Sequence, residues 1–130
     1  MDLIYQRPTK LAFDQAIARV KQELKQRSFG VLWEFDMAKK LDENQLDLGA
    51  KFVVLEVCNP QKAHQVLTQE ITVGYFLPCK MVVFEKDGQV HVGTIKPSSL
   101  MAQLPGLDLS DVASEVEEVL QATVDALAKA

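Results

Sequence analysis

The chain has 130 residues, of which 48% are hydrophobic and 25% charged, and its formal net charge at pH 7 is −4. This length fits one domain, residues 1–130, in which folding buries roughly two thirds of the surface that the unfolded chain exposes. Because the net charge is negative and the basic residues are scattered, the chain lacks the basic surface typical of nucleic-acid binding, and we expect no nucleic-acid partner.

The N-terminal segment does not have the composition of a signal peptide. Its first twenty residues contain no continuous apolar block, and their charged side chains are Asp2, Arg7, Lys10, Asp14 and Arg19. No apolar run elsewhere approaches the roughly 20 residues that a membrane helix needs. We therefore expect a cytoplasmic protein with no membrane partner.

A strand, a helix and a second strand are predicted in the first third of the chain. Residues 3–6 can form a short first strand. From residue 12 to about residue 27, apolar side chains recur every three or four positions, which is the spacing of one buried helical stripe. After Gly30, apolar and polar residues alternate through residue 37 with strand periodicity. We expect Trp33 in this strand to anchor the core or an interface.

The middle of the chain is predicted to contain the central strand of a sheet. Before it, Asp36 can cap a short helix that runs to about residue 44. Residues 52–57 are apolar at five of six positions, on both faces, which is typical of a strand that is covered on both sides or central in its sheet. Asn59 and Pro60 favour a helix start immediately afterwards, and this helix should extend to about residue 70.

Residues 71–78 are harder to assign. Their apolar side chains alternate, but Gly74 and Pro78 interrupt the pattern, so the segment is either a short edge strand or an extended connection, and we favour the connection. We expect the peptide bonds before Pro60 and Pro78 to be trans, because trans is the more common form.

The last third of the chain predicts a hairpin and a long helix. Residues 80–85 and 89–95 read as strands around the turn sequence Asp87-Gly88, which is a strong hairpin signal. A final helix begins at Asp108 or Ser110, and its apolar stripe faces the sheet or a second subunit. Its glutamates, Glu115, Glu117 and Glu118, are expected on the solvated side.

Four short motifs occur in order along the chain: Phe29-Gly30-Val31-Leu32, Cys58-Asn59-Pro60, Leu77-Pro78-Cys79 and the Asp87-Gly88 hairpin. With these motifs the chain resembles the domain of unknown function family 302 over most of its length. The resemblance implies an α+β two-layer sandwich, in which one mixed or antiparallel sheet packs against helices, with a long C-terminal helix. It also implies frequent packing as a homodimer, and it implies no reaction. The chain departs from the family pattern at Ala12, where a capping Ser or Thr is common, and in a compressed linker before residue 52.

The candidate thiol or ligand site consists of Cys58, Asn59, Pro60, Pro78 and Cys79. A thiol just ahead of a helix N-terminus feels the positive end of the helix dipole, which favours the thiolate. If the fold brings the two cysteines together, they can exchange between dithiol and disulfide or bind a soft metal ion such as Zn²⁺ or Cu⁺. Eight extended residues span about 26 Å, which is enough to return along a ten-residue helix of about 15 Å. The meeting is therefore possible but not required, and the alternative is two small buried hydrophobic side chains.

Other candidate residues form no convincing catalytic or metal site. His64 and His91 lack partners at metal-ligand spacing and are expected to be solvated or hydrogen-bonded side chains. A pair of acids can be drawn from Glu34, Asp36 and Glu56, but their spacing is also that of any exposed strand face. The chain has neither a nucleophile elbow nor a glycine-rich phosphate loop. We assign no catalytic residue, metal ligand or cofactor.

Three functional hypotheses follow from these residues. The first is a homodimeric binding or accessory domain without assigned catalysis, with an unknown small-molecule ligand. The alternative is a thiol-based redox or soft-metal-responsive protein that uses Cys58 and Cys79. The third is a small-molecule site lined by Trp33, Tyr75, Phe76 and the cysteine turns. The sequence argues against an enzyme but leaves that question open.

Overall fold

One antiparallel sheet, in the order β1-β5-β4-β3-β2, organises the chain. The structure, a computed structural model, describes residues 3–104 and 109–130. The strands are β1 (Ile4–Thr9), β2 (Gly30–Asp36), β3 (Lys51–Cys58), β4 (Cys79–Lys86) and β5 (Gln89–Ile95). The α-helices are α1 (Phe13–Gln26), α2 (Met37–Glu43), α3 (Pro60–Gln69), α4 (Pro97–Met101) and α5 (Ser110–Ala128), and a 3-10 helix, η1 (Ile71–Phe76), follows α3.

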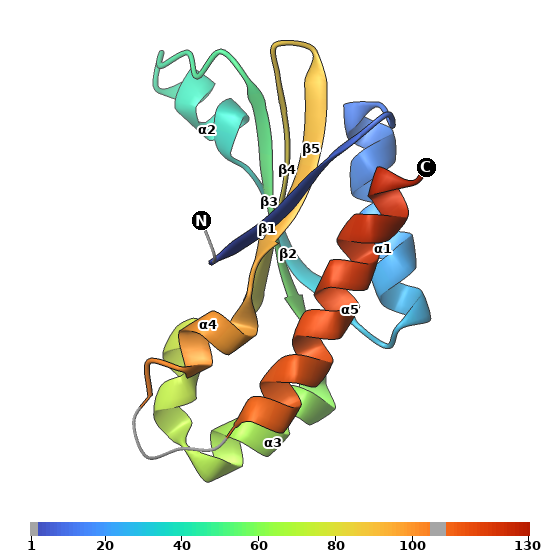
Figure 1. Cartoon of the computed structure of the whole chain (residues 1–130). Coiled ribbons are helices and arrows are strands. Elements are labelled where there is room, and N and C mark those ends of the chain that lie inside the picture. The colour runs from blue at the N-terminus through green and yellow to red at the C-terminus, as the bar shows by residue number, and fades with distance from the viewer. Residues whose placement is uncertain (1–2, 105–108) are drawn as a thin grey trace.

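The sheet and the helices form the two layers of the predicted α+β fold. Figure 1 shows α1 and α5 lying against one face of the sheet, while no helix covers the middle of the other face. Successive side chains of a strand point to opposite faces, so every second strand residue contributes to the core. The fully buried side chains of this core include Leu55, Val57, Met81, Val83 and Val92 on the sheet and Val20, Leu24, Leu120, Val124 and Leu127 on the helices. Among the described residues, no helix is long and apolar enough to cross a membrane.

The local signals for helix starts and for the hairpin are confirmed. The Asp36 carboxylate accepts the backbone N–H of Lys39 at 2.9 Å and caps α2. The turn between β4 and β5 holds Asp87 at φ 53° and Gly88 at φ 79°, the positive values that a tight hairpin requires. The last helix begins at Ser110, and the alternative start, Asp108, lies outside the described residues.

The prediction that residues 52–57 form the middle strand was wrong, because the middle strand is β4. β3 pairs with β2 and β4, so it is interior to the sheet, and α1 and α5 lie against only one of its faces. On the other face Phe52 and Val54 are apolar and Glu56 is charged; α2 contacts β3, and Val54 is only 6% exposed. Trp33, which we expected to anchor the core or an interface, is not a core residue, because 55% of its surface on β2 is exposed.

The segment between α3 and β4 also differs from the prediction. Residues 71–76 form the 3-10 helix η1 instead of an extended connection. Its start is stabilised by the Glu70 carboxylate, which accepts the N–H of Thr72 at 3.3 Å and its hydroxyl at 2.7 Å. The Leu77–Pro78 bond is cis, whereas Asn59–Pro60 is trans as expected. A cis bond before proline costs only about 0.5–1 kcal/mol, so tertiary packing can override the general preference.

Candidate thiol and ligand site

The two cysteine turns are neighbours at one end of the sheet. The register of β3 and β4 places Val57 opposite Cys79, so Cys58, the last residue of β3, lies diagonally beside Cys79. Both cysteines are free thiols. The fold therefore brings together the two halves of the candidate site that sequence spacing alone left apart.

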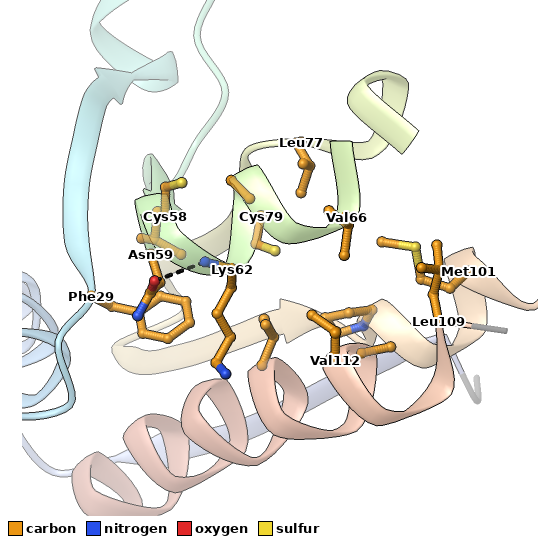
Figure 2. A pocket seen from close by; sticks show the side chains of 15 residues that line it. Phe29, Cys58, Asn59, Lys62, Val66, Leu77, Cys79, Met101, Leu109 and Val112 are labelled. Atoms are coloured by element: carbon orange, nitrogen blue, oxygen red, sulfur yellow. Dashed lines mark hydrogen bonds between the residues drawn. The ribbon is translucent and has the colours of Figure 1, made fainter. Parts of the chain in front are cut away.

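The side chains of the two cysteines do not face each other. Val57 and Cys79 point to the helix-covered face, and Cys58 follows Val57, so its side chain leaves the strand on the opposite side. Figure 2 shows the two sulfur atoms pointing in different directions. A disulfide needs Cβ atoms about 4 Å apart and directed toward each other, so this arrangement does not favour one.

Burial, not the helix dipole, dominates the protonation of both thiols. Burial raises the pKa of Cys58. Burial, followed by the nearby charges of Cys58 and Glu56, raises the pKa of Cys79 to about 11. The expected thiolate at the start of α3 is thus not favoured. One reason is that the Asn59 side chain already accepts the backbone N–H of Lys62 at 3.0 Å, so this amide is not free to stabilise a thiolate.

The raised pKa predicts that Cys79 reacts slowly with alkylating reagents. A shift from 9.0 to about 11 lowers the thiolate fraction at pH 8 about 100-fold, and only the thiolate is nucleophilic. We expect the rate of Cys79 modification by iodoacetamide, followed by mass spectrometry, to rise with pH until about pH 11. The Cys58→Ser variant should behave in nearly the same way, because burial is the largest cause of the shift. Half-maximal labelling of native Cys79 near pH 8 would contradict this expectation.

Asn59 and Pro60 have structural roles at the start of α3. The Asn59 oxygen caps the helix, and its amide nitrogen donates to the carbonyl of Ser28 at 3.2 Å. Pro60 is the first residue of α3, where a missing N–H has no cost. Both ends of the Asn59 side chain are therefore occupied within the chain.

A small cavity lies under the cysteine turns, among α3, α4 and α5. Figure 2 shows Cys79, Val66, Met101 and Val112 around it, and its volume is about 30 Å³. One water needs about 10–15 Å³ of such space, so the cavity has room for only two or three waters. Its lining is almost entirely apolar. We interpret it as an imperfection of core packing and not as a ligand site.

A larger depression opens beside this cavity, and we call it the α4 groove. Its volume is about 300 Å³. It is lined by residues of the sheet, η1, the following turn and α4: Glu56, Tyr75, Phe76, Leu77, Pro78, Cys79, Lys80, Ile95, Pro97, Leu100 and Met101. Tyr75, Phe76 and the Leu77-Pro78-Cys79 turn thus meet as predicted for a small-molecule site, whereas Trp33 and the Cys58-Asn59-Pro60 turn do not line the groove.

The sequence did not point to the α4 wall of this groove. Leu100 and Met101 lie one turn after Pro97, but nothing in that short pattern indicates that α4 folds against η1. Glu117 of α5, which we expected to be solvated, holds α4 in place: its carboxylate accepts the N–H of Ser98 at 3.1 Å and its hydroxyl at 2.6 Å. Glu115 similarly forms an ion pair with Lys62 of α3.

The remaining acidic candidates have structural partners. Asp36 caps α2, Glu34 pairs with Lys21, and Glu56 pairs with Lys80 at 3.1 Å. In the part of the chain that the structure describes, no three His, Cys, Asp or Glu side chains form a group able to hold a metal ion.

The two histidines also lie apart from the cysteine turns. His64 is exposed on α3. His91 stacks on Phe84 with ring centroids 4.9 Å apart, on the face of the sheet away from α1 and α5. Neither histidine lines the small cavity or the α4 groove.

Comparison with known proteins gives a family but no activity. Residues 5–127 match the family model described as "Domain of unknown function DUF302". Among solved structures, the crystal structure of an uncharacterised conserved DUF302 protein from Bacillus stearothermophilus is similar to this chain, with 40% sequence identity and a TM-score of 0.89. The alignment covers 96% of this chain and 98% of that chain. No curated protein matches the chain.

Proposed function

Because the chain belongs to the DUF302 family, whose description states no reaction, we propose a function from geometry alone: a homodimeric binding or accessory domain of the cytoplasm, without assigned catalysis. The observation that carries the dimer is the uncovered face of the sheet. We call this surface, on the side away from α1 and α5, the open face (Figure 1).

The open face is apolar and rich in aromatic side chains. By strand register its residues are Ile4, Gln6 and Pro8 on β1, His91, Gly93 and Ile95 on β5, Lys80, Val82, Phe84 and Lys86 on β4, Phe52, Val54 and Glu56 on β3, and Trp33 and Phe35 on β2. Trp33 stacks on Phe35 with centroids 5.1 Å apart, and Phe84 lies between Phe52 and His91 at 6.0 and 4.9 Å. A contiguous apolar surface of this kind marks an interaction site in a soluble protein.

The size of the open face fits a dimer interface. Five strands about 4.8 Å apart, with about seven residues of about 3.4 Å each, give a face of roughly 20 by 24 Å, or roughly 500 Å². Two copies would then bury roughly 1,000 Å², which is about the minimum for a specific interface.

The charges of the open face favour a second copy as its partner. Glu56 and Lys80 pair with each other at 3.1 Å, and Lys86 is a further base at the far end of β4. The central part of the face, around Val82 and Phe84, is therefore neutral without any partner. In a two-fold interface the same patch meets itself, and neutral patches of this kind do not repel each other. A strongly charged partner would lose hydration there without gaining an opposite charge.

The dimer is tested by the mass of the protein in solution. Size-exclusion chromatography with light scattering at micromolar concentration should give twice the 14.5 kDa of one chain. A mass near 14.5 kDa under these conditions would rule out the homodimer.

A thiol-based redox or soft-metal-responsive role is the second candidate. It is supported by the position of Cys58 and Cys79 at neighbouring strand ends and by the Met101 thioether, which lines the same cavity. Soft sulfur donors of this kind suit Cu⁺. Against it stand the raised pKa values of both thiols. The iodoacetamide experiment described above distinguishes the thiol-based role from the binding role. A Cys79 that reacts as a thiolate near neutral pH would favour the thiol-based role.

A further inference from the structure

The α4 groove has the size and lining of a small-molecule site. Its volume of about 300 Å³ lies at the lower end of the roughly 300–1,000 Å³ found for ligand pockets. One water needs about 10–15 Å³ of such space, so the groove has room for roughly 20–30 water-sized groups.

The walls of the groove are apolar and partly exposed to water. Leu100 and Met101 form the α4 side, Tyr75 and Phe76 the η1 side, and Ile95 the end of β5. Tyr75 is 90% exposed, so its ring has no packing partner that a ligand would have to displace. An apolar molecule that covers these side chains gains about 25 cal/mol for each Å² of apolar surface removed from water.

The α4 wall is fixed in position before any ligand arrives. Both the N–H and the hydroxyl of Ser98 donate to the Glu117 carboxylate on α5. A wall that is held in this way loses little conformational entropy when a ligand binds.

The polar end of the groove is a neutral pair. Lys80 and Glu56 lie 3.1 Å apart there, with 44% and 15% of their side-chain surface exposed. The ammonium group has N–H donors beyond the one directed at Glu56, and a carboxylate has several acceptor positions. A hydroxyl or amide can accept from Lys80 and donate to Glu56 at the same time. An anion would instead meet the negative charge of Glu56, and a cation the positive charge of Lys80.

We propose that the α4 groove binds a small, uncharged and largely apolar molecule that carries a hydroxyl or amide group at one end. This inference gives a ligand class to the binding role proposed above, and it does not require the dimer. The apolar body lies between α4 and η1, and the polar group lies against the Lys80–Glu56 pair. No covalent step involves Cys79, whose thiol is protonated at neutral pH.

The test uses three probes with the same eight-carbon chain: 1-octanol, octanoate and octylammonium. Protein with ¹³C-labelled methionine methyl groups provides internal controls, because Met101 lines the groove while Met81 is fully buried in the core and Met37 lies on α2. We expect 1-octanol to shift the Met101 methyl signal in a saturable way and to leave Met37 and Met81 in place. The two ions should bind at least about 10-fold more weakly. An unmoved Met101 signal, or equal affinity for all three probes, would overturn the proposal.

Matched variants locate the binding. Leu100→Glu places a charge in the apolar wall and should weaken 1-octanol binding at least about 10-fold. Ile71→Glu makes a comparable change on η1, 74% exposed and outside the groove lining, and should have no effect. If the Leu100→Glu and Ile71→Glu variants bound 1-octanol with equal affinity, the α4 groove would not be the binding site.

The Val82→Arg variant separates this inference from the proposed dimer. Val82 belongs to the open face and does not line the groove, whereas Glu56, Lys80 and Ile95 belong to both surfaces. If dimerisation covers these three residues, the variant should bind 1-octanol more tightly than the wild type, and if the wild type is a monomer the two proteins should bind it equally well. A wild-type protein that proved to be a monomer in solution would thus not contradict the binding of 1-octanol in the α4 groove. Loss of 1-octanol binding in this variant would contradict a site confined to the α4 groove.

Discussion

Arginine in place of Val82 is expected to convert the protein from twice 14.5 kDa to 14.5 kDa in solution. Val82 lies on β4, the middle strand, opposite Val54 on β3 and Gly93 on β5, and is therefore near the centre of the open face. Two copies meeting there would bury two like charges without partners, which costs several kcal/mol. A cost of about 4 kcal/mol raises the dissociation constant about 1,000-fold. Light scattering over a range of protein concentrations measures this change.

The same substitution at a site outside the open face provides the control. Ile71→Arg on η1, where the side chain is 74% exposed, should keep the wild-type mass. The Val82→Arg protein should also keep its circular dichroism spectrum, because Val82 does not contribute to the core between the sheet and the helices. A folded Val82→Arg protein that retains the dimer mass would show that the copies associate through another surface or not through this face alone.

Alanine in place of Leu55 should strongly lower the stability of the protein. Leu55 is completely buried on the helix-covered face of β3. Removal of a buried leucine side chain leaves a cavity and lowers the free energy of unfolding by about 2–5 kcal/mol. Urea denaturation measures the loss. Wild type and variant must be compared at one protein concentration, because a dimer makes apparent stability concentration-dependent.

Leu46→Ala is the matched control for this prediction. It removes the same atoms from a side chain that is 58% exposed, beyond the end of α2. Exposed substitutions usually change stability by no more than about 0.5 kcal/mol. If the two leucine variants unfolded at similar urea concentrations, Leu55 could not be a core residue and the assignment of the two sheet faces would be wrong.

The sequence predicted most of the elements because their signals are local. The α1 stripe recurs within one helical turn, Asn59 and Asp36 accept N–H groups only three residues away, and Asp87-Gly88 forms a turn between adjacent strands. Contacts of this range depend on the residues near them in the chain, so a pattern of a few positions is sufficient to indicate them.

The apolar content of residues 52–57 shows where such local reasoning fails. An apolar strand face gives the same sequence pattern whether a helix of the chain covers it, a partner protein covers it, or it is exposed. The sequence therefore placed these residues in the middle of the sheet, whereas strand pairing gives that position to β4. The same ambiguity concealed the open face until the positions of α1 and α5 were known.

The amino-acid sequence by itself determined the family, the α+β class, the helix caps and the hairpin, because each depends on residues close together in the chain. Only the tertiary structure decided that Cys58 and Cys79 are neighbours with protonated thiols and that α4, η1 and the Lys80–Glu56 pair enclose a groove. These features depend on strand register and on burial. Both are set by residues that are distant in sequence and that meet only when the sheet and its helices pack together.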